Sequence, residues 1–268
     1  MSRKNSSQSG FSLLESVVGL GAGAILLVVA TRFYKDSYRT YNLQEQVAER
    51  NQNAHYTVKK ITEVLQQAGS DLPASGWDVI TASGSPPIIT VGSNPRGGVQ
   101  FITSVAPAPP TNKIPVSDTA NFSKATHVLV DYLAAGVATV KAPITNRIAG
   151  IAAGDPDTLV ISPGLTTPLS VGDMVYAYRI DAYLVSGTNL ILRPEGDATK
   201  DMVLAENIDS LGVTFKKTDA TTATTWSNMR SAVLGVRART AVRDPRIKAD
   251  SGYHKIRMTM NLLLRNKI

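Results

Sequence analysis

A long apolar run near the N-terminus constrains the fold of this chain more than any other feature. It covers residues 11–34 and reads FSLLESVVGLGAGAILLVVATRFY, with no charged residue between Ser16 and Thr31. An α-helix rises about 1.5 Å per residue, so a helix of this length can cross the hydrocarbon core of a bilayer, which is about 30 Å thick. We therefore expect a membrane-spanning helix over residues 11–34.

The residues on either side of this run indicate the orientation of the helix in the membrane and whether it is retained. The ten residues before it are polar and include Arg3 and Lys4. Basic residues favour the cytoplasmic side of a membrane, although Arg32, Lys35 and Arg39 beyond the run reduce this bias. A secretory signal peptide would end in a small-x-small cleavage site, whereas this run continues directly into charged residues. The sequence therefore favours a retained span with a cytoplasmic N-terminus over a removed signal peptide.

One carboxylate, Glu15, lies inside the apolar run. A charged side chain at the centre of a bilayer costs about 2.5–3.5 kcal/mol on insertion scales and less near the interface, so such residues usually have a partner. A plain membrane anchor would not need this residue. Glu15 is therefore a candidate functional residue.

The segment Gly10-Phe11-Ser12-Leu13-Leu14-Glu15 resembles the class III signal sequence of type IV pilins and type II secretion pseudopilins. In that family a prepilin peptidase cuts after the glycine and methylates the new N-terminal phenylalanine. The resemblance implies cleavage between Gly10 and Phe11, loss of residues 1–10 as a leader peptide, and N-methylation of Phe11. It also implies a role for Glu15 in subunit assembly. Glu15 of one subunit can pair with the Phe11 ammonium of its neighbour, which turns two separate burial costs into one ion pair.

The helical pattern continues beyond the apolar run. Apolar and small residues recur at three- and four-residue spacing, at Tyr34, Tyr38, Tyr41, Ala48, Ala54, Val58, Ile61, Leu65 and Ala68. Gly69 is a candidate C-cap, and Pro73 prevents the helix from resuming. We expect one spine helix over residues 11–68, about 87 Å long. Residues 11–34 would form its transmembrane half, and residues 35–69 its amphipathic half, packed on a sheet.

Residues 70–268 are predicted to form a β-rich globular head. Gly, Pro, Ser and Thr dominate residues 71–121, which predicts loops with one or two short strands. Ser186-Gly187-Thr188 is a candidate hairpin turn, and the final strand alternates apolar Ile256, Met258, Met260 and Leu262 with polar residues. Later strand patterns cover residues 126–133, 158–162, 173–185, 189–193, 211–216, 233–240 and 254–264. The predicted fold class is α+β, with the long N-terminal helix packed on an antiparallel sheet.

The order of these elements resembles the PilW group of minor pilins and, more distantly, the J-type pseudopilins of type II secretion. The resemblance is carried by Ala68-Gly69, Asp173-Met-Val-Tyr-Ala-Tyr178, Leu190-Ile-Leu-Arg193, residues 204–215, Trp226 and Leu264-Arg265-Asn266. The chain departs from the pattern at Lys216-Lys217, where a tyrosine-glycine pair often stands, and residues 71–121 match no pattern of the group. The resemblance implies a pilin-like fold.

Positive charge is concentrated near the C-terminus. The chain has a formal net charge of +7. Ten Lys or Arg against Asp244 and Asp250 give residues 227–268 a net charge of +8. Such a segment could bind an anionic surface or nucleic acid, or it could simply be a solvated face. The candidate binding residues are Arg230, Arg237, Arg239, Arg243 and Arg246.

No catalytic or metal site is predicted. The chain has no cysteine, and its three histidines, His55, His127 and His254, lack the spacing of metal ligands. Nucleotide-binding and hydrolase motifs are absent from the sequence. Two aspartate-bearing stretches, 154–157 and 244–250, lack the alternating oxygen ligands of a calcium loop, which favours ordinary turns. We expect neither an enzyme nor a cofactor.

The sequence and the resemblance together predict a minor pilin that acts structurally in the initiation, assembly or tip of a type IV pilus. The bulky head favours a minor over a major pilin. The implied partners are other minor and major pilins, the prepilin peptidase, the inner-membrane assembly platform and membrane lipid, with nucleic acid less favoured. The implied location is the bacterial inner membrane, with the head in the periplasm, and then the pilus or cell surface. The alternatives are a pseudopilin of type II secretion, or a surface-exposed pilin that binds DNA or a host surface through its basic C-terminal part.

Overall fold

The computed structural model describes residues 12–69, 72, 79–84, 87–94, 99–102, 111–120, 122, 127–132, 137–148, 157–165, 168–225 and 228–264. Within these residues the fold is α+β, with one long N-terminal helix and antiparallel sheets, as predicted. The chain divides into two compact units, Met1–Glu49 and Arg50–Ile268, and the boundary lies inside the helix. The predicted leader residues 1–10, Phe11, Pro73, Trp226 and Arg265-Asn266 lie outside the described residues.

The helix α1 extends over Leu13–Gln67 without interruption, close to the predicted range of 11–68. It ends where the sequence predicted its C-cap: Gly69 has a φ of 73°. This left-handed conformation is readily accessible to glycine, because glycine has no Cβ. The backbone N–H of Leu72 then donates to the Gly69 carbonyl at 3.3 Å, which closes the turn after the helix.

Only the later part of the predicted apolar stripe on α1 is buried. Its members within the second unit are buried at Ala54, Ile61, Leu65 and Ala68, with Val58 partly buried. The members before Arg50, namely Tyr34, Tyr38, Tyr41 and Ala48, are exposed. Thr57 and Thr62 are buried beside the apolar residues, which apolar spacing alone did not predict.

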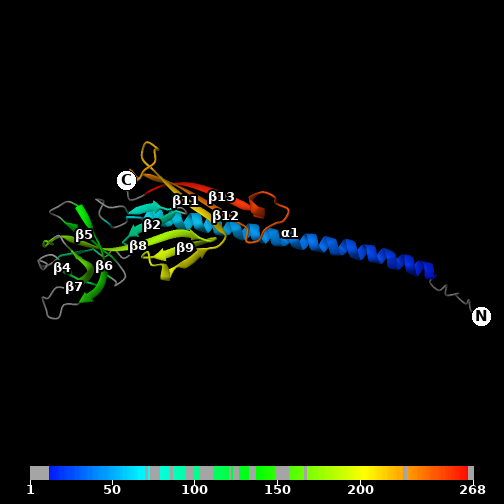
Figure 1. Cartoon of the computed structure of the whole chain (residues 1–268), viewed down its shortest axis with the longest axis horizontal. Coiled ribbons are helices and arrows are strands. Elements are labelled where there is room, and N and C mark those ends of the chain that lie inside the picture. The colour runs from blue at the N-terminus through cyan, green and yellow to red at the C-terminus, as the bar shows by residue number, and fades with distance from the viewer. Residues whose placement is uncertain are drawn as a thin grey trace, which may run out of the picture. The chain divides into compact units, whose positions relative to one another are not determined.

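A three-stranded antiparallel sheet covers this part of α1 (Figure 1). It is formed by β11 (Ile208–Lys216), β12 (Ser231–Arg239) and β13 (Lys255–Leu263), in the order β11-β12-β13. The alternation predicted for β13 is observed: Leu262 is buried and Ile256 and Met258 pack against the core, although Met260 remains 40% exposed. The helix and one face of this sheet share a core that includes Leu211, Phe215, Ala232, Leu234, Val236 and Ala238.

The other described strands form a ten-stranded antiparallel sheet. Its main order is β1-β2-β8-β5-β6-β7-β4, with β3 and β9 also paired to β8 and β10 paired to β9. The strands are β1 (Ile80–Ser83), β2 (Ile88–Ser93), β3 (Val99–Phe101), β4 (Thr111–Val116), β5 (His127–Tyr132), β6 (Val137–Ile148), β7 (Asp157–Leu165), β8 (Met174–Ser186), β9 (Asn189–Pro194) and β10 (Met202–Ala205). The predicted turn joins β8 to β9, with Gly187 at a φ of 63°.

The long strand β8 connects two apolar cores. Its second half pairs with β2 and β9 and contributes Tyr183 and Val185 to the core that contains α1. Its first half pairs with β3 and β5 and contributes Val175 and Ala177 to a second core. This second core is built from Ile102, Ile114, Val116, Phe122, Val128, Val130, Leu159, Ile161 and Leu169. The head therefore contains a second apolar core, which the predicted architecture of one sheet packed on one helix did not include.

The main error of the sequence prediction concerns residues 71–121 and the strands that follow. Four strands, β1 to β4, lie where one or two were expected, and β6 and β10 were not predicted. Pro115 lies in β4, which pairs with β7 at the end of the main strand order and is therefore an edge strand, where proline is tolerated. Register shifts interrupt the pairing of β6 with both neighbours. Such bulges break the period-two pattern by which strands are recognised.

Candidate functional site

The first part of α1 is an apolar helix that nothing within the described chain covers. Its large apolar side chains are all exposed, from Leu13 at 85% to Val28 at 53%. The most apolar 18-residue window of α1 has no buried residue, and α1 is long and apolar enough to cross a membrane. Large contiguous apolar surfaces on a protein mark contacts with lipid or with other proteins. This segment is therefore a contact surface.

Ser12 and Glu15 define the start of α1. The backbone N–H of Leu14 donates to Ser12 Oγ at 3.3 Å, and the N–H of Ser16 donates to the Ser12 carbonyl at 3.1 Å. Ser12 therefore acts as the N-cap residue. Glu15 lies in the first turn, where the partial positive charge of the helix N-terminus favours a carboxylate. Its carboxylate makes no hydrogen bond or ion pair with any other described residue.

Ser12 and Glu15 also have the spacing of a capping box, which the sequence analysis missed. In a capping box the N-cap serine bonds the helix start, while the glutamate three residues later reaches back to the N-cap N–H. The serine half of this arrangement is present here. The signal was visible in the sequence as Ser-x-x-Glu before an apolar run. Glu15 thus has two candidate roles: it can complete the capping box at the start of α1, or it can pair with a cation. Gly10 and Phe11, the residues of the predicted cleavage site, lie outside the described residues.

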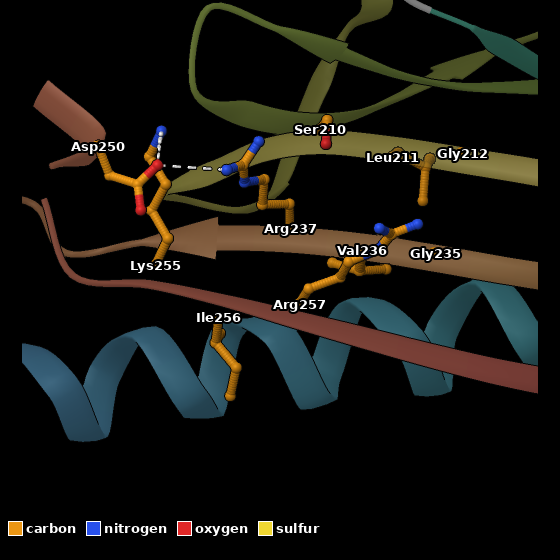
Figure 2. A pocket seen from close by; sticks show the side chains of 10 residues that line it. All are labelled: Ser210, Leu211, Gly212, Gly235, Val236, Arg237, Asp250, Lys255, Ile256 and Arg257. Carbon is orange, nitrogen blue, oxygen red and sulfur yellow. Dashed lines mark hydrogen bonds and ion pairs between the residues drawn. The ribbon is translucent and has the colours of Figure 1, made fainter.

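The basic C-terminal part is organised around Asp209 and Asp250, the second of which is drawn in Figure 2. Asp209 lies in β11 at a register shift opposite β12. Its carboxylate is 3.9 Å from Arg237 Nε, 3.8 Å from Arg239 Nη1 and 3.5 Å from Lys255 Nζ. Asp250 is 3.4 Å from Arg237 Nη2 and 3.6 Å from Lys255 Nζ. Arg237 and Arg239 therefore already have acidic partners within the chain.

The other three arginines do not extend this cluster into a single patch. Arg230 immediately precedes β12, whereas Arg239 ends it, so they lie about 30 Å apart along an extended strand. Arg239 also stacks on the ring of Tyr253, with 4.4 Å between its Cζ and the ring centroid. Arg243 and Arg246 lie in the segment between β12 and β13, beyond the end of β12. The five residues are therefore spread over both ends of the sheet.

In the described part of the chain, no group of three or more His, Asp or Glu side chains could hold a metal ion. His55 is exposed on α1 and His127 lies in β5. His254 Nε2 is 3.4 Å from Asp244 Oδ2.

The aspartates of the two candidate calcium stretches have local roles. Asp157 accepts hydrogen bonds from the Thr119 N–H at 3.0 Å and the Thr119 hydroxyl at 2.9 Å. Asp244 accepts from the Arg246 N–H at 2.9 Å, and this bond is the main cause that lowers the pKa of Asp244. Residues 154–156 lie outside the described residues. Both aspartates stabilise loops.

No family model, no curated protein and no solved structure matches the chain.

Proposed function

We propose that this chain is a minor pilin of a type IV pilus system, made as a prepilin and acting structurally in initiation, assembly or at the tip of the filament. Prepilin peptidase would remove residues 1–10 and methylate Phe11. The N-terminal part of α1 would lie in the inner membrane before assembly and between neighbouring helices afterwards. The head would lie in the periplasm and then on the pilus or cell surface.

One observation supports this proposal above the others. A Gly-Phe junction is followed by Glu15 in the first turn of a helix whose apolar side chains are exposed from Leu13 to Tyr41. An ordinary membrane anchor accounts for the apolar surface but leaves the carboxylate without a cationic partner in lipid. If identical or related helices pack together, their apolar side chains cover this surface. The Phe11 ammonium of a neighbouring subunit can then pair with Glu15.

Binding of DNA or a host surface through the basic C-terminal part is a weaker candidate. Arg237 and Arg239 already lie beside Asp209, and Arg230 lies at the opposite end of β12. Partly neutralised and dispersed cations give a weaker field for a polyanion than a continuous basic stripe. We therefore assign Arg237 and Arg239 to ion pairs within the head rather than to a binding surface for a polyanion.

The processing step tests the proposal directly. Mass spectrometry of the protein extracted from membranes should give an N-terminus at Phe11 that carries one methyl group. Gly10→Leu should leave residues 1–10 attached, because a side chain at this position obstructs the peptidase. Gly19→Leu is the matched control and should be processed normally. A mature protein that begins at Met1, or after Ala30, would exclude a prepilin.

A deletion strain separates the pilus from the secretion system. If the chain is a minor pilin, loss of the gene should reduce surface pili while type II secretion continues. If the chain is a pseudopilin of type II secretion, the opposite result is expected. Complementation with the full chain should restore whichever process is lost.

A further inference from the structure

The face of the β11–β13 sheet that points away from α1, here called the outer face, contains two adjacent glycines. Gly212 of β11 and Gly235 of β12 are direct partners across the two strands, so they share one face of the sheet. A Cβ atom at Gly212 would have no atom within 4 Å, and one at Gly235 would meet only the Gly212 carbonyl oxygen at 3.9 Å. The two residues form a strip of bare backbone that is open to solvent, which we call the glycine floor.

A cavity of about 450 Å³ lies over this floor (Figure 2). Its charged lining residues are Arg237, Lys255, Arg257 and Asp250. In Figure 2 Asp250, Arg237 and Lys255 gather at one end of the cavity, joined by the two ion pairs of Asp250, and the Arg257 guanidinium is directed away from them. A volume of about 300–1,000 Å³ is typical of ligand pockets.

The charges around the cavity are unequally compensated. Arg237 and Arg257 are direct partners on β12 and β13, and like charges in this position destabilise a sheet. Asp209 and Asp250 compensate Arg237 and Lys255. The Arg257 side chain is exposed and makes no ion pair or hydrogen bond with any other residue that the structure describes. One uncompensated guanidinium therefore lies beside the glycine floor.

We propose that this cavity binds an acidic side chain on an extended peptide segment of another protein. Arg257 receives the carboxylate, since a guanidinium can bind a carboxylate through two parallel hydrogen bonds. The glycine floor lets the backbone of the bound segment approach the sheet closely, because no side chain stands between them. This site is independent of the proposed role of α1, so either assignment can fail without the other.

The charge pattern favours a peptide over a nucleic acid. Asp250 lines the same cavity, and Asp209 lies within 4 Å of cations at its edge. These two carboxylates would repel successive phosphates of a polyanion, whereas a single carboxylate can be paired by the guanidinium of Arg257 alone. The site is thus complementary to an isolated negative charge.

The test uses the full chain in detergent micelles, with ¹⁵N-labelled arginine side chains observed by NMR. The probe is the blocked tripeptide glycine-glutamate-glycine, added to millimolar concentration, and the control probe carries glutamine in place of glutamate. We expect a saturable shift of the Arg257 Nε–Hε signal with the glutamate peptide and no shift with the glutamine peptide. Absence of a shift at Arg257, or equal shifts at Arg246, would overturn the site.

Variants separate the site from the general charge of this region. Arg257→Gln should weaken peptide binding by about tenfold or more, because it removes a charge-assisted hydrogen-bonding group. Gly235→Val should also weaken binding by filling the floor, and the space above Gly235 accepts the side chain. Arg246→Gln removes the same charge from an exposed loop and should leave binding unchanged. A DNA dodecamer is the alternative probe. If it bound more tightly than the peptide, and if Arg257→Gln abolished that binding, the site would bind nucleic acid and the proposal would be refuted.

Discussion

The ring of Tyr178 packs directly against the backbone of Gly92, so closely that a Cβ atom on Gly92 would overlap the ring. The same glycine is held on both sides by backbone hydrogen bonds. Its N–H donates to the Val79 carbonyl at 2.7 Å, and its carbonyl accepts from the Gly69 N–H at 3.1 Å. Gly92 therefore joins β8 to the residue that ends α1, and this junction has no room for any side chain.

We predict that Gly92→Ala destabilises the head by about 1–3 kcal/mol, the range expected when a methyl group is forced into a filled core. The matched control is Gly212→Ala, also in a strand, where a Cβ meets nothing within 4 Å. That change should be neutral or slightly stabilising, since alanine loses less backbone entropy on folding than glycine. Urea unfolding followed by circular dichroism measures both. Equal stability of the two variants would show that Tyr178 can move away from Gly92.

Alkaline pH should destabilise the head through its buried tyrosines. Burial raises the pKa of Tyr183 to about 12, assisted by the nearby charge of Asp181, and burial raises the pKa of Tyr178 even further. An unfolded tyrosine loses its proton near pH 10. Above that pH the unfolded state binds fewer protons than the folded state, so the free energy of unfolding falls as pH rises.

The slope contributed by each such tyrosine approaches about 1.4 kcal/mol per pH unit once the unfolded phenol is ionised. The measurement is the urea midpoint at a series of pH values on either side of pH 10. Tyr178→Phe keeps the ring against Gly92 but removes the titrating group, so its stability should fall less steeply. The idea fails if Tyr178→Phe and the parent protein lose stability in parallel.

The second unit should fold without the membrane span. A protein that begins near Asn42 retains Ala54, Ile61 and Leu65, which are buried in the core shared by α1 and the sheets. We expect it to be soluble and to unfold cooperatively. A protein that begins after Pro73 lacks all three and should aggregate, because it exposes the apolar face of the β11–β13 sheet. If the shorter protein were equally soluble and stable, α1 would not belong to this core.

Single substitutions measure the same packing more finely. Leu65→Ala should cost about 2–5 kcal/mol, the range for truncation of a fully buried leucine. Leu263→Ala removes the same atoms from β13, where the side chain is 69% exposed, and should change stability little. Chemical denaturation of the soluble second unit gives both values. Similar costs at the two positions would contradict the observed burial of Leu65.

Three forms of residue 15 separate its two candidate roles. Glu15→Gln keeps a side chain that can complete the capping box but removes the charge, whereas Glu15→Ala removes both. If Glu15 pairs with the Phe11 ammonium of a neighbour, both variants should insert into the membrane yet fail to enter the assembly complex. If Glu15 only caps α1, Glu15→Gln should assemble normally. Co-purification with the other pilins after crosslinking measures the outcome.

Sequence patterns that span only a few residues correctly predicted the end of α1, the turn between β8 and β9, and the strand β13. The end of α1 at Gly69 and the turn at Gly187 follow from the positive φ that glycine permits, and both are observed. The strand β13 was recognisable because one of its faces packs on the core while the other is solvated. Each of these features is visible within a window of a few residues.

Long-range features were the ones that sequence reasoning missed. The strand β4 contains Pro115, and only its place at the edge of the sheet makes this acceptable. No sequence pattern distinguishes Asp209 from other aspartates, and only the folded structure places its carboxylate near Arg237, Arg239 and Lys255. The glycine floor likewise depends on the register that sets Gly212 opposite Gly235. Register and pairing cannot be derived from one strand alone.

The contact between Thr62 and Met260 has a consequence for how the protein is made. The Thr62 hydroxyl donates to Met260 Sδ at 3.4 Å, although 198 positions separate them in the chain. At a synthesis rate of about 5–20 residues per second, the ribosome needs about 10–40 s to reach β13 after completing this part of α1. During that interval the helix lacks its last covering strand, so part of its apolar face stays uncovered until synthesis of the chain is nearly complete.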